Sequence, residues 1–152
     1  MLWLDSDSRA LEGAHRALRR RHPSWQMVWV TSPERARAFV LSNEIDVLIT
    51  DVTFEGGAAG RLLSWVAEQE PSLPCLIVTR RPDLARRSLL PKNVQRVLLK
   101  PIDEDVLIGC LERALRAKNV SVAPPRSEPA PTSRSAVACS ARLGNALRFS
   151  AR

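Results

Sequence analysis

The sequence predicts an α/β domain built on a doubly wound parallel sheet, and three observations support this fold class. Short apolar runs alternate with helical patterns along residues 1–118, as expected for parallel strands joined by crossover helices. The runs are rich in aliphatic and β-branched residues, which favours buried strands. The chain has 152 residues, of which 45% are hydrophobic, and this is enough for one domain around one core.

The first part of the domain contains three predicted strands and two predicted helices. Ser8 is the predicted N-cap of a helix that ends near Arg21, before Pro23. Pro33 occupies the first position of a second helix, which ends near Ser42. The strands are expected at residues 2–5, 25–30 and 45–50.

The second part continues the alternation with two more strands and three more helices. The strands are expected at residues 75–78 and 94–99, and a helix at 60–69 precedes the first of them. A short, arginine-rich helix is expected between Pro82 and Pro91. Asp103 opens the last helix, whose acidic start and basic end suit the helix dipole.

The composition changes at Asn119, where large apolar residues become rare and Ser, Pro, Ala and Arg dominate. We therefore expect the chain to divide into a folded domain at 1–118 and a disordered tail at 119–152, rich in Pro, Ser, Ala and Arg. The net charge of +7 is uneven, because the tail holds five Arg and one Glu. The charge thus says little about the folded domain, and without a reader motif direct DNA binding is not expected.

Several cellular roles are not favoured by the sequence. No apolar stretch approaches the length of a membrane span, and the first residues do not resemble a secretory signal. The three cysteines, Cys75, Cys110 and Cys139, lack metal-ligand spacing, and their odd number favours reduced thiols. A cytoplasmic location is the expectation.

Four polar residues stand where predicted strands end. Asp5, Asp51, Thr79 and Lys100 follow or close their apolar runs, and the carboxyl ends of parallel strands meet at the edge where open α/β sheets place their sites. Two acids, a hydroxyl and an ammonium suit Mg²⁺ binding and the handling of a phosphoryl group. Taken alone, Asp51 could instead cap the glycine-containing loop that follows it.

This ordered pattern, with Lys-Pro after the fifth strand, resembles the receiver domain of two-component response regulators. The resemblance covers about residues 1–118 and implies the flavodoxin-like sheet with strand order 2-1-3-4-5. It implies that Asp51 is the phosphoacceptor and that Thr79 and Lys100 contact the phosphoryl group. It also implies Mg²⁺ held by Asp5, Asp51 and the backbone carbonyl of Thr53, an oxygen set that this ion favours.

The chain departs from the family pattern at three places. The family usually has two adjacent acids after the first strand, whereas this chain has Asp5 and then Ser6. Ser6 or Asp7 is therefore a further candidate metal ligand, and Asp7 is also a candidate helix cap. Gly60 comes one position later than the family's glycine, and Val97 replaces the usual switch aromatic.

The resemblance implies a single-domain response regulator in a phosphorelay, not a metabolic enzyme. Its expected partners are a sensor histidine kinase or phosphotransfer protein and a downstream protein target, and a homodimer is compatible with the sequence. The alternative is a pseudo-receiver that binds proteins without phosphorylation, which Ser6 and Val97 favour. A nucleotide-binding enzyme is a weaker hypothesis, because no glycine-rich loop follows the first strand.

Overall fold

The computed structural model describes residues 1–54, 57–81, 83 and 90–122. Within these residues the chain alternates five strands and four helices in the predicted order. The strands are β1 (Leu2–Leu4), β2 (Val28–Val30), β3 (Leu48–Asp51), β4 (Cys75–Thr79) and β5 (Val94–Leu99). The helices are α1 (Ser8–Arg21), α2 (Pro33–Ser42), α3 (Ala58–Gln69) and α4 (Glu104–Val122).

The five strands form one parallel sheet in the order β2-β1-β3-β4-β5. This confirms the predicted doubly wound, flavodoxin-like architecture and its strand order. Strands β1, β3 and β4 lie inside the sheet, and every residue of these three strands is buried. The order changes direction between β1 and β3, so the carboxyl ends of these two strands form the crevice where such sheets place their sites.

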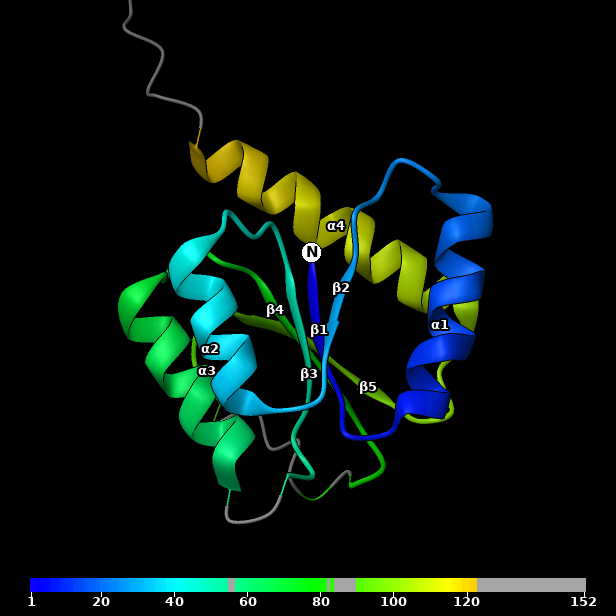
Figure 1. Ribbon diagram of the computed structural model, residues 1–152. Coiled ribbons are helices and arrows are strands. Elements are labelled where there is room, and N and C mark those ends of the chain that lie inside the picture. The colour runs from blue at the N-terminus through cyan, green and yellow to red at the C-terminus, as the bar shows by residue number, and fades with distance from the viewer. Residues whose placement is uncertain (55–56, 82, 84–89, 123–152) are drawn as a thin grey trace, which may run out of the picture.

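Helices cover both faces of the sheet (Figure 1). Helices α2 and α3 pack together on one face, and α1 and α4 lie on the other. Two separate hydrophobic clusters result. In β1, Leu2 and Leu4 belong to the α2–α3 cluster, whereas Trp3 belongs to the α1–α4 cluster. The alternation of side chains along a strand thus divides the core in two.

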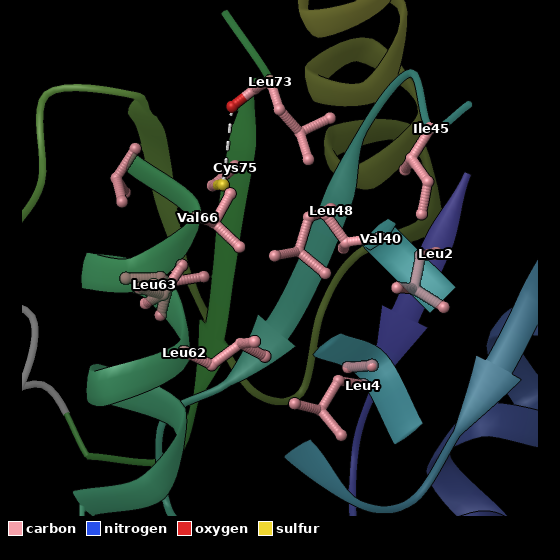
Figure 2. Close-up of a cluster of buried hydrophobic side chains, with 13 residues drawn as sticks. Leu2, Leu4, Val40, Ile45, Leu48, Leu62, Leu63, Val66, Leu73 and Cys75 are labelled. Atoms are coloured by element: carbon pink, nitrogen blue, oxygen red, sulfur yellow. Dashed lines mark hydrogen bonds between the residues drawn. The ribbon is translucent and has the colours of Figure 1, made fainter. Parts of the chain in front are cut away.

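The α2–α3 cluster is shown in Figure 2, where Leu62, Leu63 and Val66 of α3 face the sheet. Leu63 is 1% exposed and Val66 is fully buried, so these residues form the buried face of α3. At the edge of this cluster the buried Cys75 Sγ lies 3.6 Å from the carbonyl oxygen of Leu73, and burial raises the pKa of this thiol to about 12. Cys75 is therefore a core residue, as its apolar surroundings in the sequence indicate.

The structure corrects several predicted boundaries. Strand β2 begins at Val28 instead of residue 25, strand β3 begins at Leu48, and α3 begins at Ala58. The predicted cap Ser8 is the first helical residue of α1, and the carbonyl oxygen of Asp7 accepts the N–H of Leu11 at 3.2 Å. Such shifts of one to three residues are common, because sequence periodicity locates helix and strand interiors better than their ends.

The last helix also continues beyond the predicted domain boundary. Helix α4 runs to Val122, so residues 119–122 are helical and do not belong to a tail that starts at 119. Residues 119–122 contain neither proline nor glycine, and the first strong helix breakers in the sequence are Pro124 and Pro125. The remaining predicted tail, 123–152, lies outside the described residues, as does most of the helix predicted between Pro82 and Pro91.

Among the helices of the described segments, none combines the length and apolar character needed to cross a membrane.

Candidate functional site

Asp5 and Asp51 are brought side by side by the register of β1 and β3. Leu4 pairs with Thr50, so the next residues along the two strands are the two acids. Asp5 is 1% exposed and Asp51 is 4% exposed, which is unusual for carboxylates. Buried charges of this kind need a counter-charge and hydrogen bonds.

Lys100 supplies the counter-charge from a strand two positions along the sheet from Asp51. It follows β5, and its backbone N–H donates to the carbonyl oxygen of Thr79 at 2.8 Å, which fixes the start of its side chain beside β4. Its Nζ donates to Asp5 Oδ2 at 2.5 Å and to Asp51 Oδ2 at 2.7 Å. The lysine side chain is only 8% exposed, so one ammonium neutralises part of the charge of two buried acids.

The second oxygen of Asp51 is held by Thr53. The backbone N–H and the hydroxyl of Thr53 donate to Asp51 Oδ1 at 2.8 and 2.7 Å. Burial, the largest single effect, raises the pKa of Asp51, but the hydrogen bonds from Lys100 and Thr53 together outweigh it. The pKa of Asp51 is consequently below its usual value, and the residue is a carboxylate at neutral pH.

The loop after β1 places its polar residues differently. The backbone N–H of Asp7 donates to Asp5 Oδ1 at 3.0 Å, which closes a tight turn around Asp5. The Asp7 carboxylate is directed toward the loop after β4, where Arg80 Nη2 donates to Asp7 Oδ2 at 3.2 Å. Ser6 is exposed to solvent.

Thr79 ends β4 and is fully buried. Its hydroxyl oxygen accepts the backbone N–H of Arg81 at 3.0 Å, an interaction that fixes the first turn of the following loop. Thr79 therefore lies one strand from Asp51. Its backbone carbonyl holds the Lys100 backbone, but among the described residues its hydroxyl is not a partner of the Asp51 or Lys100 side chain.

The donor set fits a magnesium ion in the number and type of its ligands. Mg²⁺ in phosphoryl-transfer sites is commonly held by one or two carboxylates, with water and phosphate oxygens completing the octahedron. Asp5 and Asp51 each direct one oxygen at the Lys100 ammonium, so the two carboxylates converge on one point. In the described segments no cluster of three or more His, Cys, Asp or Glu side chains suitable for a metal ion is found.

The structure thus joins three of the predicted site residues, Asp5, Asp51 and Lys100, by direct contacts. Thr53 was predicted to act through its backbone carbonyl, and the structure adds its backbone N–H and hydroxyl as partners of Asp51. Sequence reasoning did not identify Arg80 as a residue near the site. Its position directly after Thr79 is the signal that could have identified it, since that places it at the same edge of the sheet.

Comparison with known proteins gives a consistent result at the level of the fold. No protein-family model and no curated protein matches the sequence. Solved structures do match. The signal receiver domain of an HD domain-containing protein from Pseudomonas fluorescens Pf-5 is 24% identical, with a TM-score of 0.71 over 79% of this chain and 88% of that one.

Two other matches are also response regulator structures. A CheY-like receiver domain protein from Methanospirillum hungatei JF-1 is 14% identical, with a TM-score of 0.71 over 79% of this chain and 95% of that one. The response regulator TrrA from Thermotoga maritima, solved in complex with Mg²⁺ and BeF, is 16% identical, with a TM-score of 0.66 over 75% and 96% of the two chains. The chain therefore has the receiver fold.

Proposed function

We propose that this protein is a response regulator of a phosphorelay that accepts a phosphoryl group on Asp51. The phosphoryl donor is a sensor histidine kinase or a phosphotransfer protein, and the output is a change in contacts with a downstream protein. The observation that carries the proposal is the contact of one buried lysine with two buried carboxylates at the carboxyl edge of the sheet. Burying two like charges beside a single cation costs stability, and arrangements of this kind cluster at functional sites.

The chemistry expected at Asp51 is nucleophilic attack on phosphorus. A carboxylate oxygen of Asp51 forms the new O–P bond as the P–N bond to the donor histidine breaks, and the imidazole nitrogen leaves with the electron pair and takes up a proton. Asp51 is ionised before the reaction because Lys100 and Thr53 stabilise its charged form. The geometry needs no proton removal from the nucleophile, so positioning and charge neutralisation are the main demands.

Lys100 and Thr53 are placed to serve the product as well as the nucleophile. The Lys100 ammonium already contacts Asp51 Oδ2, so its hydrogen bond can shift to an oxygen of the attached phosphoryl group without a large motion. Thr53 keeps the other oxygen of Asp51 in position through two hydrogen bonds. Mg²⁺ held by Asp5, Asp51 and the Thr53 carbonyl would neutralise charge on the transferring group.

One feature favours a second candidate function, a pseudo-receiver that binds proteins without phosphorylation. Ser6 leaves the site with one acid fewer than the family pattern, and Lys100 alone already balances much of the remaining charge. In that case the acids and the lysine would serve only to fix the loops of a binding surface.

Intact-mass spectrometry after incubation with acetyl phosphate and Mg²⁺ separates the two functions. A single phosphoryl adduct in the parent protein, absent from an Asp51→Asn variant, is the expected result. Omitting Mg²⁺ should lower the yield of the adduct. If neither protein gains mass under any Mg²⁺ concentration or with phosphoramidate as donor, the proposal is wrong and the pseudo-receiver function stands.

A further inference from the structure

The ion pair between Asp7 and Arg80 joins two of the loops at the edge of the sheet that carries the candidate site. Asp7 belongs to the loop after β1, and Arg80 to the loop after β4. Strand β3 lies between β1 and β4 in the sheet, so a contact joining these two loops spans the end of β3, where Asp51 is placed. A hollow of about 350 Å³ beside the site is lined by Asp5, Arg80 and Lys100, together with residues of α1 and the start of α4.

The position of Asp7 relative to the two acids is fixed by its backbone. Its N–H donates to Asp5 Oδ1 at 3.0 Å, so its Cα lies next to the Asp5 carboxylate. Its side chain is 37% exposed and is held at 3.2 Å by an arginine that is 68% exposed. A pair this exposed is weak, because water screens it and can replace either partner.

Charge provides the reason why this weak pair matters. Asp5, Asp51 and Lys100 sum to one net negative charge, and the exposed Ser6 contributes none. A divalent cation binds more tightly when one more carboxylate is available. Asp7 follows Ser6 directly in the sequence, and Arg80 is a cation that pairs with its carboxylate.

We propose that Asp7 replaces the acid missing at Ser6 as a ligand or close counter-charge for Mg²⁺, and that Arg80 competes with the metal for it. The inference rests on the proposed function, since it concerns the metal of the phosphorylation site. Metal binding then requires Asp7 to exchange a monovalent guanidinium for the divalent ion. Arg80, once released, stays at the mouth of the site as a second cation beside Lys100.

The test is isothermal titration of MgCl₂ at constant ionic strength into the full-length protein and four variants. Arg80→Ala is expected to bind Mg²⁺ about two- to fivefold more tightly than the parent, which is the range that an exposed ion pair supports. Arg81→Ala is the matched control, because it removes a positive charge from the same loop, and the Arg81 side chain pairs with Asp83 instead of Asp7. Arg81→Ala should therefore change the Mg²⁺ affinity less than Arg80→Ala does. Asp7→Asn should bind more weakly than the parent.

The double variant Asp7→Asn/Arg80→Ala isolates the coupling between the two residues. In the Asp7→Asn background, Arg80→Ala should tighten Mg²⁺ binding no more than Arg81→Ala does in the parent. Equal effects of Arg80→Ala and Arg81→Ala, or an Arg80→Ala gain that persists without Asp7, would overturn the competition. All five proteins should show the same circular dichroism, because the three substituted side chains are exposed to solvent.

Phosphoryl uptake by the parent, measured separately by intact mass, keeps this inference distinct from the proposed function. If the parent takes up phosphate on Asp51 but Arg80→Ala brings no tighter Mg²⁺ binding, the competition is rejected and the proposed function stands. If only Arg80→Ala binds Mg²⁺, the competition is supported in its strongest form. If neither binds Mg²⁺, the competition is rejected, and the mass measurement alone decides the function.

Discussion

Replacing Lys100 with methionine tests whether this residue is the counter-charge of the site. Methionine keeps much of the side-chain volume but removes the ammonium. Asp5 Oδ2 and Asp51 Oδ2 lie within about 5 Å of each other, because both bond the same nitrogen, and at an effective dielectric constant near 20 two unit charges at that distance repel by about 3 kcal/mol. Removing one partner of a buried ion pair typically costs about 3–5 kcal/mol. We expect Lys100→Met to lose about 3 kcal/mol of stability at pH 7, a fall in melting temperature on the order of 10 °C.

The assay is urea unfolding followed by circular dichroism at pH 7 and at pH 4. The deficit of Lys100→Met should shrink at the lower pH, because protonation of either carboxylate removes the repulsion. Adding Asp5→Asn should recover part of the loss at pH 7. Lys118→Met is the control: this lysine also contacts an acid, Asp46, at 3.3 Å, but Asp46 is 56% exposed, so the loss should stay below about 1 kcal/mol.

A Lys100→Met protein as stable as the parent at pH 7 would refute the reasoning. So would a deficit that is the same at pH 7 and pH 4, because that would point to lost packing and not to charge.

Two further predictions concern the acid site and the core. The fold stabilises the ionised form of Asp51, so the stability that this carboxylate contributes is complete above its unfolded-state pKa of about 4 and is lost as the pH falls through its lower folded-state pKa. The melting temperature of Asp51→Asn should therefore decline less steeply than that of the parent between about pH 5 and pH 2. Parallel profiles would contradict the lowered pKa. Leu63→Ala should lower the free energy of unfolding in urea by about 2–5 kcal/mol, because Leu63 is 1% exposed in the α2–α3 cluster. The control Leu41→Ala should lower it by less than about 0.5 kcal/mol, because this side chain is 69% exposed. Equal losses would show that the cluster is not packed as described.

The fold was largely predictable from the sequence, because its buried strands carry the signal. Residues of β3 and β4 are all buried, and such strands appear in a sequence as uninterrupted aliphatic runs. Their polar last residues, Asp51 and Thr79, stand out against those runs. The sequence pattern predicts the start of β2 three residues too early. Its residues are only half-buried, and the apolar residues before it extend the pattern.

The site was predictable in its composition but not in its contacts. The sequence order identifies Asp5, Asp51 and Lys100 as neighbours at one sheet edge, yet it does not show that one ammonium contacts both acids. The pairing of Asp7 with Arg80 joins residues 73 positions apart and depends on the lengths and turns of two loops. Such loop geometry leaves no periodic trace in a sequence, so these side-chain directions required the structure.

The alternation along β1 bears on how this chain can change during evolution. Leu2 and Leu4 fill one half of the core, Trp3 fills the other, and Asp5 follows at once. Inserting or deleting a single residue before Asp5 would exchange the two sets of side chains and move the acid out of line with Asp51. Length variation among descendants of this sequence should therefore accumulate in the connections between strands and helices, while the count of residues from the start of β1 to its acid stays fixed.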